Sequence, residues 1–492
     1  MKKNFNYVIF SFIMICLIIL NVFVINGSEK YIYLIIASLL TIIFAYFNYK
    51  KENISIQKKF LMLIIPLGIF YMLVLPIGTI PDESNHFYRT YEISEGKLIS
   101  KWDRKLKSAG NYLPTNIDKV NSSNYREINQ NIKTNKSTEK TFIGFSNTAL
   151  YSPVCYIPQV IGASIAKIFT NNFTIMAYFG RIFNFIIFCL LMFCSIKIIP
   201  TKKNLLLFIS LLPITIQEAV SLSPDALTIS SCTLLISFIF YLKEKKGLLN
   251  IREKLLIIIL PIIIALCKIV YLPVCLLLFL IPKEKFGSLK KKNIFIFTLA
   301  FFVVLINLLW TSKVSIFLTA NLHGSNSTKQ IKYILNYPFI YLKTLFNTFN
   351  IYADFHIFNM LGRYLSLFNV NVYAPYIYIN LLVLILLLIQ NEKTKKETKK
   401  NLIFEKTLLI FCFISTIILI FTSIYIQWTP YMLDYVDGVQ GRYYLPIILL
   451  VGLAINNIFN FNIKENIMNK YILLFMIIEN LSACLTIISV YS

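Results

Sequence analysis

The segment from Thr79 to Glu92 holds several residue types that can do chemistry, at helical spacing. A helix that begins near Pro81 places Asp82, His86 and Arg89 at positions i, i+4 and i+7 of one face. A carboxylate beside an imidazole can deprotonate a hydroxyl, and a guanidinium can hold a phosphate. The competing interpretation is an ordinary helix start, because a first-position Pro and acids in the first turn suit any helix N-terminus.

Glu83 adds a second carboxylate to this segment. Glu83 and His86 have the i, i+3 spacing found in some metal sites, although no third ligand is recognisable. Asp82 and Glu83 are therefore candidates for a loosely held divalent cation, and no cofactor is certain. Gly-x-Gly-x-x-Gly and Walker-type phosphate loops are absent from the sequence, which argues against a cytosolic nucleotide as the direct fuel.

Two further acidic and basic motifs follow. Asp225 stands in Ser223-Pro224-Asp225 at the start of an apolar run, and Glu218 lies one turn before the break that precedes it. An N-cap Ser, a Pro and a dipole-matched Asp explain this motif locally. A functional role gains weight from topology, which places Asp225 on the same face as Asp82.

Basic residues with adjacent tyrosines form the remaining candidates. Lys268 precedes Tyr271 inside an apolar stretch, where a lysine is costly and needs a partner. Arg442 and Tyr443 follow Gly441 in a short loop, where guanidinium and backbone donors can grip an anionic headgroup. An interfacial Arg and aromatic belt is the alternative for Arg442, and a structural pair with a buried carboxylate is the alternative for Lys268.

The elements that position these residues are membrane helices. Of the 492 residues, 57% are hydrophobic and 14% charged, proportions that exclude a soluble domain, a disordered chain and a coiled coil. Apolar runs of 17 residues or more match the length of helix that crosses about 30 Å of hydrocarbon. The formal charge of +25 comes from lysine clusters beside these runs, which orient a membrane protein and do not form a nucleic-acid surface.

The sequence predicts an all-α integral membrane protein with 12 to 13 transmembrane segments in one polytopic domain. The expected segments are 8–26 (a retained first helix), 31–48, 60–79, 174–199, 204–220, 225–242, two short arms within 255–281, 294–311, 372–390, 407–426, 443–458 and 470–490. With the N-terminus in the cytoplasm, the inner loops hold 26 Lys and Arg, whereas the short outer loops hold only Lys30, Lys268 and Arg442.

The same charge rule settles two ambiguous segments. The apolar run 151–169 is placed in the outer interface, because counting it as a crossing would export most later lysine clusters. The stretch 255–281 is predicted to be a hairpin with arms of about thirteen residues that returns to the inner face. Lys268 then lies at membrane depth facing a cavity. Two long outer loops remain, 80–173 with interfacial helices and 312–371.

Taken together, the motifs resemble a bacterial family of multi-pass membrane proteins, known as domain of unknown function 2142. The motifs, in order, are Pro81-Asp82-Glu83, His86-Phe87-Tyr88-Arg89, Glu95-Gly96, Gly180-Arg181, Ser223-Pro224-Asp225, Lys268 before Tyr271-Leu272-Pro273, and Gln440-Gly441-Arg442-Tyr443. This family is similar in plan to the GT-C glycosyltransferases. The resemblance runs from about residue 60 to 460 and implies an acidic residue in the first large outer loop and a lipid-phosphate-linked sugar as donor.

The resemblance also implies roles for the candidates. Asp82 would be the general base or would orient the acceptor, with Glu83 as its neighbour or a metal ligand. Arg89, Lys268 and Arg442 would neutralise the leaving polyprenyl phosphate, and Asp225 would contact sugar or metal. Further substrate-binding candidates are His86, Tyr271 and Tyr443.

We therefore expect a glycosyltransferase of the bacterial cytoplasmic membrane with its active site on the outer face. It would transfer a sugar from a polyprenyl-phosphate-linked donor to a cell-surface glycan, with membrane lipid around it and no nucleic acid as partner. The alternatives are a flippase or transporter of lipid-linked glycans, for which the broken hairpin is suited, and a polymerase or ligase that joins glycan repeats.

Overall fold

The structure is a computed structural model, and it describes residues 54–320, 323–392, 399–459, 461 and 465–492. The expected helices 8–26 and 31–48 lie outside the described residues. Within the described part, six helices are long and apolar enough to cross a membrane. They are α3 (Ile56–Val74), α8 (Phe173–Ile198), α11 (Asp225–Glu244), α13 (Leu289–Val314), α17 (Lys399–Gln427) and α19 (Glu465–Tyr491).

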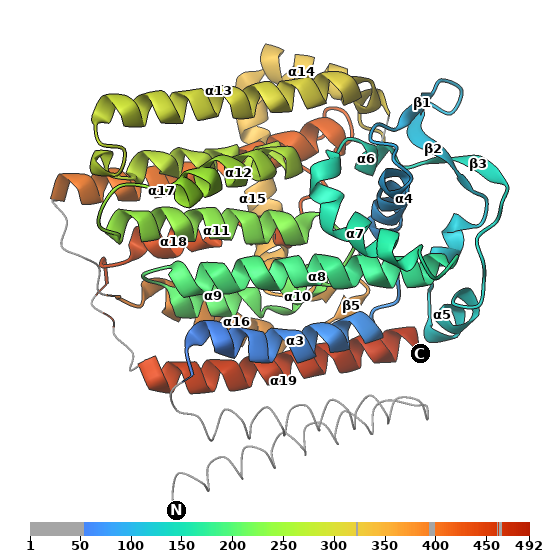
Figure 1. Cartoon of the computed structure of the whole chain (residues 1–492), viewed down its shortest axis with the longest axis horizontal. Coiled ribbons are helices and arrows are strands. Elements are labelled where there is room, and N and C mark those ends of the chain that lie inside the picture. Colours follow the sequence, from blue (N-terminus) through green and yellow to red (C-terminus); the bar gives the residue numbers. More distant parts are fainter. Residues whose placement is uncertain (1–53, 321–322, 393–398, 460, 462–464) are drawn as a thin grey trace, which may run out of the picture.

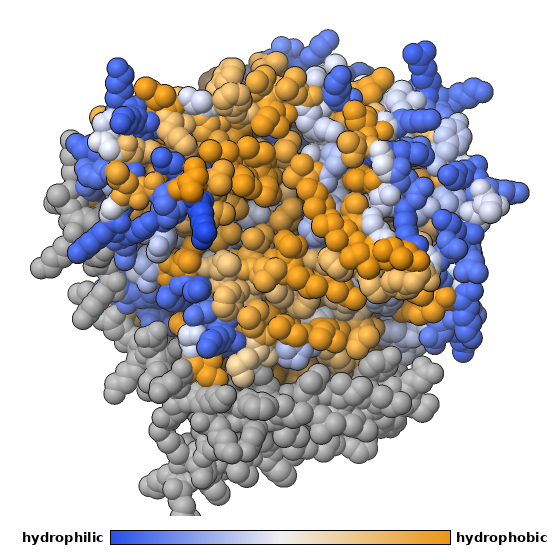
Figure 2. Space-filling model, viewed as in Figure 1, coloured by the Kyte–Doolittle hydropathy of each residue, from blue (hydrophilic) through white to orange (hydrophobic). Residues whose placement is uncertain are grey.

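These long helices run in roughly the same direction and form the body of the molecule (Figure 1). Their side chains share one large core, and α11 is the most enclosed of the six, with 94% of its apolar window buried. Figure 2 shows an apolar band across the helices, with polar residues at both of their ends. A band of this kind is what a bilayer requires, and the chain is an all-α membrane protein as predicted.

Two predicted spans are wrong in detail. The expected helix 204–220 is broken into α9 (Lys203–Ser210) and α10 (Pro213–Ala219). Pro213 has no N–H to continue the helix, and it begins the second piece at a position where none is needed. The expected helix 443–458 consists of a 3-10 turn, η6 (Gly441–Tyr444), and the short α18 (Ile448–Ile455).

The hairpin predicted within 255–281 is confirmed. Its arms are α12 (Ile251–Cys267) and a 12-residue 3-10 helix, η3 (Ile269–Leu280), and Lys268 lies at the tip between them. The Leu249 N–H donates to the Lys285 carbonyl at 3.0 Å, so the chain returns to the end where it began. An α-helical arm of thirteen residues would span about 20 Å. The 17 residues of α12 span about 25 Å, and the 12 residues of η3 span about 24 Å because a 3-10 helix rises more per residue.

The segment 80–173 forms a cap at one end of the bundle. It contains α4 (Glu83–Ser94), η1 (Ile117–Val120), α5 (Tyr125–Asn131), α6 (Ser146–Ala149), η2 (Pro153–Tyr156) and α7 (Ile157–Ala166). It also contains an antiparallel sheet that the sequence did not predict, of β1 (Lys101–Asp103), β2 (Ser108–Pro114) and β3 (Lys140–Gly144) in the order β1-β2-β3. Gly110 is the partner of Lys101 on one side and of Gly144 on the other. As expected, the apolar run near residue 160 does not make a span, because α7 has only 10 residues.

The segment 312–371, which was expected to be a long loop, is mostly helical. It holds η5 (Ser315–Thr319), α14 (Ser327–Asn336) and the 23-residue α15 (Pro338–Met360), followed by the strands β4 (Tyr364–Leu365) and β5 (Val370–Asn371). In Figure 1, α15 runs across the direction of the long helices, and α16 (Ala374–Ile389) then returns into the bundle.

The lysine-rich connections lie at the end opposite the cap (Figure 1). There the Lys202 N–H donates to Glu392, and the Asn391 N–H donates to the Phe461 carbonyl, which joins three separate loops. A short 3-10 turn, η4 (Lys283–Lys285), follows the hairpin at the same end. The fully described loops that the charge rule assigned to the inner side, at 202–203, 243–254 and 283–292, therefore lie at one end of the structure.

Candidate functional site

Asp82 and Glu83 are adjacent in the chain, but their carboxylates have different surroundings. Asp82 precedes α4 in a left-handed conformation (φ 62°), is exposed, and accepts a hydrogen bond from Asn147 Nδ2 at 2.7 Å. Glu83 is 1% exposed, and its oxygens lie 2.8 and 2.7 Å from Nε and Nη2 of Arg181 on α8. Glu83 thereby joins the start of α4 to α8, whereas Asp82 stays accessible from the cap.

Arg89 is fully buried in a network of its own. Its guanidinium donates to Glu92 at 2.5 Å, to Ser100 at 3.2 Å and to the Leu98 carbonyl at 2.8 Å. Asn111 also donates to Glu92, from strand β2. These bonds tie α4 to the sheet of the cap, and Arg89 has no ion pair with the other candidate residues.

The other charged candidates meet at the cap end of the bundle. Asp225, the first residue of α11, is ion-paired through Oδ1 with Lys268 at the hairpin tip, and Oδ2 lies 3.4 Å from Nε of Arg442. Arg442 Nη1 also donates to both carboxylate oxygens of Glu218 at 3.1 Å. The helix break before α11, the hairpin tip and η6 thus each supply part of one row of alternating charges.

This row, which we call the charge cluster, consists of Lys268, Asp225, Arg442 and Glu218. The side chains of Glu218, Arg442 and Asp225 are 0%, 4% and 7% exposed, while that of Lys268 is 13% exposed. Ion pairs this deeply buried hold together when every charge has a partner. The four formal charges sum to zero, and Lys268 is the member that a ligand reaches most easily.

His86 lies beside the charge cluster in α4. Its imidazole Nδ1 is 2.8 Å from the hydroxyl of Tyr156, and its ring centroid is 6.0 Å from that of Tyr151. The pKa of His86 is lowered from 6.5 to about 4, chiefly by burial. The charges of Asp82 and Asp225 oppose this shift, and those of Arg442 and Lys268 add to it. His86 is therefore neutral at pH 7 and has the capacity to accept a proton.

Tyr271 and Tyr443 connect the hairpin to η6. The Tyr271 hydroxyl donates to the Tyr443 carbonyl at 2.9 Å. The Tyr443 ring centroid is 4.7 Å from Nζ of Lys268 and 5.5 Å from Cζ of Arg442, which are cation–π distances. The aromatic face helps to hold both cations in place.

Gly441 allows Arg442 to lie close to Asp225 and Glu218. Its N–H donates to Asn359 Oδ1 at 2.6 Å, and a Cβ at this position would lie 2.1 Å from the backbone nitrogen of Met360. Only glycine allows η6 to lie against the end of α15 at this distance. In the Gly441-Arg442 pair of the sequence motif, Gly441 is thus required for close packing against α15, and Arg442 supplies the ion pairs.

A family model for multi-pass proteins, described as "Predicted membrane protein (DUF2142)", matches residues 65–451. The chain belongs to this family. No curated protein and no solved structure matches the chain. The family description states membrane location and no activity, so the chemistry of the site is argued from its residues.

The predicted site residues are brought together in part. Asp225, Lys268, Tyr271, Arg442 and Tyr443 are in contact with one another. His86 is near enough for the charges of Asp225, Lys268 and Arg442 to act on it, and the charge of Asp82 acts on both His86 and Arg442. Glu83 and Arg89 are occupied by buried partners. The metal site suggested for Asp82 and Glu83 remains a prediction, and the described residues contain no group of three or more His, Cys, Asp or Glu side chains able to hold a metal ion.

Three neighbours of the site were not among the predicted site residues. Tyr151, Tyr156 and Glu218 lie in or beside apolar runs, where only tertiary contact shows their role. Glu218 is one turn before the helix break that precedes Asp225, and this spacing was the one available signal.

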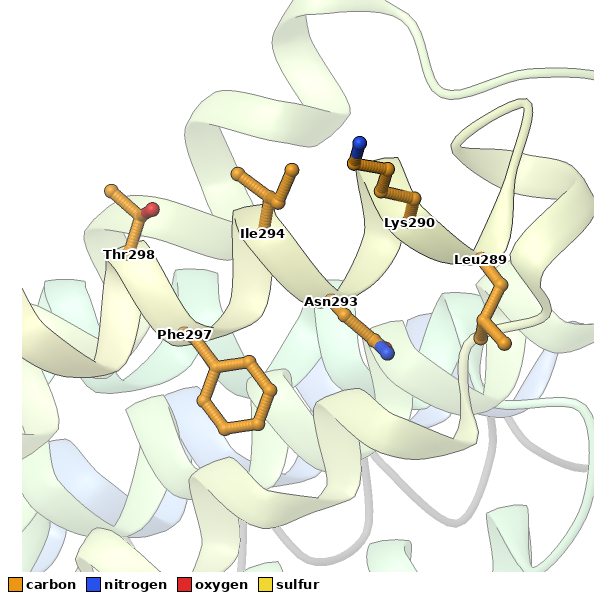
Figure 3. Close-up of a pocket in the computed structure, with 6 residues that line it drawn as sticks. All are labelled: Leu289, Lys290, Asn293, Ile294, Phe297 and Thr298. Carbon is orange, nitrogen blue, oxygen red and sulfur yellow. The ribbon is translucent and has the colours of Figure 1, made fainter.

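A hollow on the side of α13 is separate from this site. The residues that line it are Leu289, Lys290, Asn293, Ile294, Phe297 and Thr298 (Figure 3). All of them come from the first turns of one helix, at the end of the bundle opposite the cap (Figure 1). One helix face does not make a set of converging groups, so we assign the hollow no part in the site.

Proposed function

We propose that this protein is a glycosyltransferase that moves a sugar from a polyprenyl-phosphate-linked donor to a cell-surface glycan on the outer face of the bacterial cytoplasmic membrane. The observation that carries the proposal is the charge cluster below the cap, with Asp82 and His86 beside it. A reaction that releases a lipid phosphate needs cations where negative charge develops and a base for the acceptor hydroxyl.

In the proposed reaction, Asp82 takes the proton of the acceptor hydroxyl, directly or through neutral His86. The acceptor oxygen forms a bond to the anomeric carbon of the sugar while the bond from that carbon to the phosphate oxygen breaks. Lys268 receives the developing phosphate charge, because it is the most exposed cation of the charge cluster. Asp225 and Arg442 hold Lys268 and its surroundings in position.

The lipid part of such a donor needs apolar surface close to these charges. Ile269, the residue after Lys268, is 52% exposed, and the arms of the hairpin continue the apolar surface below the cap. A phosphate at Lys268 would have its polyprenyl chain beside Ile269 and its sugar toward Asp82. This arrangement suits an amphiphilic donor better than a soluble one.

Two other functions use the same features. A polymerase or ligase of lipid-linked glycans would need the same phosphate contacts with a larger acceptor. A flippase or transporter is supported by the broken hairpin, since discontinuous helices with a charged residue at the break are common in transporters.

The deciding experiment compares surface glycans and the polyprenyl-linked sugar pool in wild-type, deletion and Asp82→Asn strains at equal membrane abundance. The transferase predicts that deletion and Asp82→Asn both remove one sugar and accumulate its lipid-linked donor. Asp118→Asn, which changes an exposed acid elsewhere in the cap, is the matched control and should leave both unchanged. If deletion alters the glycans but Asp82→Asn does not, the result favours a transporter over a transferase.

A further inference from the structure

Glu479 is a fully buried acid in the membrane-spanning helix α19. Asn380 Nδ2 donates to its Oε1 at 2.5 Å, and Oε2 has no hydrogen-bond partner. Among the described residues, no Lys, Arg or His forms an ion pair with it. An isolated carboxylate in such a place is very costly, because neither water nor a counter-charge compensates for the loss of hydration.

Asn380 in α16 also has one side-chain oxygen without a hydrogen-bond partner. It is also fully buried, and its Nδ2 group donates to the Leu361 carbonyl at 3.1 Å as well as to Glu479. Both amide hydrogens are thus used, whereas Oδ1 has no partner. Two side chains joined by one hydrogen bond each retain one unpaired buried oxygen, although buried oxygens are nearly always paired.

One proton on Glu479 accounts for both unpaired oxygens. A neutral carboxylic acid is a donor through one oxygen and an acceptor through the other, and a primary amide is the matching acceptor and donor. The two groups can then close a ring of two hydrogen bonds, from Oε2 to Oδ1 and from Nδ2 to Oε1. An ionised Glu479 has no proton to donate, so Asn380 Oδ1 stays without a partner.

We propose that Glu479 is a proton-binding site inside the helix bundle, occupied at neutral pH and closed onto Asn380 as an acid–amide pair. Among the described residues, the titratable groups whose electrostatics respond to Glu479 are Tyr71 on α3 and Tyr376 on α16, and neither supplies a positive charge. No residue of the charge cluster takes part in this acid–amide pair, so the proposal does not depend on the proposed reaction.

The polar residues around Glu479 also connect several helices of the bundle. The next residue, Asn480, accepts a hydrogen bond from the Tyr71 hydroxyl at 2.9 Å and donates to the Leu211 carbonyl at 2.9 Å. Leu211 lies in the break between α9 and α10. The proton on Glu479 therefore belongs to a polar layer that joins α19 to α3, α16 and the broken helix.

Infrared difference spectroscopy of the purified full chain in detergent or nanodiscs tests the protonation state. Subtracting the spectrum of Glu479→Gln from that of the wild type at pH 7 should leave the carbonyl band of a protonated carboxylic acid. Glu405→Gln is the matched control, since Glu405 is ion-paired with Lys243 and its loss should remove carboxylate bands. If the Glu479 difference also contains only carboxylate bands, the proposal is wrong.

Thermal unfolding gives a second, independent readout. Gln at position 479 keeps one donor and one acceptor, so Glu479→Gln should unfold at the wild-type temperature. Glu479→Leu and Asn380→Leu each leave partners unpaired and should unfold at lower temperatures. A fall in the unfolding temperature of Glu479→Gln as large as that of Glu479→Leu would overturn the acid–amide pair.

Discussion

Lys268, at the tip of the α12–η3 hairpin, is ion-paired with Asp225, the first residue of α11. Residues 43 positions apart in the chain are thus joined where a helix begins and a hairpin turns. The N-terminus of α11 itself favours an acid, and the acid in turn stabilises a lysine inside the bundle. Each residue makes the other tolerable at a place where neither would be stable alone.

Lys268→Met should therefore reduce both stability and function. Removing one partner of a buried pair typically costs about 3–5 kcal/mol, and the loss here should fall below that range because Arg442 still faces Asp225. Thermal unfolding in detergent measures the first effect and surface-glycan analysis the second. Lys290→Met, at an exposed lysine of α13, is the control and should change neither. A fully active and stable Lys268→Met protein would contradict both roles.

Asp82 and Glu83 should separate activity from stability. Glu83→Gln leaves Arg181 buried without its counter-charge, so we expect about 3–5 kcal/mol less stability and low membrane abundance. Asp82→Asn keeps an amide able to contact Asn147 and should unfold like the wild type while losing activity. Unfolding temperature and glycan composition, measured on both variants, check this. Equal loss of stability in the two variants would mean that Asp82 is also a structural residue.

Much of the helical plan could be predicted from the sequence because each long helix carries its own apolar run. The limits of α8 and α11 follow from the runs they occupy, and the charge rule correctly required the hairpin at Lys268. Short pieces were harder to predict. The break at Pro213 follows from the missing N–H of that proline, but the apolar run around it reads the same whether it is continuous or interrupted, and so does the run that contains the short α18.

The site residues that could be predicted are charged residues within or beside apolar runs of the sequence. Lys268, Asp225 and Arg442 do so, and the structure places them together. Glu83 and Arg89 stand out equally, yet they serve buried pairs with Arg181 and Glu92. Sequence spacing shows that a charge needs a partner, and it does not show whether that partner is a protein group or a ligand.

His86 makes stability depend on pH. Its pKa is about 4 in the folded protein and 6.5 when exposed, so the unfolded state binds more protons between these values. The protein gains nothing from His86 above pH 6.5 and loses up to about 3 kcal/mol as the pH falls toward 4. His356 has the same shift for the same reason, burial. Unfolding temperatures between pH 7 and pH 5 should fall less steeply in His86→Gln than in the wild type. They should fall least in the variant that also carries His356→Gln, and identical slopes would contradict the shift.

Two buried cysteines test whether the cap and the hairpin tip touch. Cys155 precedes Tyr156 in η2 and Cys267 precedes Lys268. Both side chains belong to one small core cluster, and Cys155 Sγ lies 3.9 Å from the carbonyl oxygen of Leu266, the residue before Cys267. Copper phenanthroline should therefore form a disulfide between them, which peptide mapping under non-reducing conditions would detect. Serine at either position should abolish the linked peptide, and Cys189 and Cys484 should stay unlinked. Finding both thiols free after oxidation would show that η2 and the hairpin tip lie further apart.

Glu479→Gln separates transfer from proton-driven transport. A carrier that uses a membrane-embedded acid must bind and release its proton, and glutamine cannot. A transferase that acts at the charge cluster has no need of that exchange, since its energy comes from the bond between sugar and phosphate. We therefore expect Glu479→Gln cells to keep wild-type surface glycans, with Asp82→Asn cells as the inactive reference. Loss of the glycan in Glu479→Gln at normal membrane abundance would favour a proton-coupled carrier, because the substitution keeps the size and hydrogen-bonding capacity of the acid and removes only its ability to release a proton.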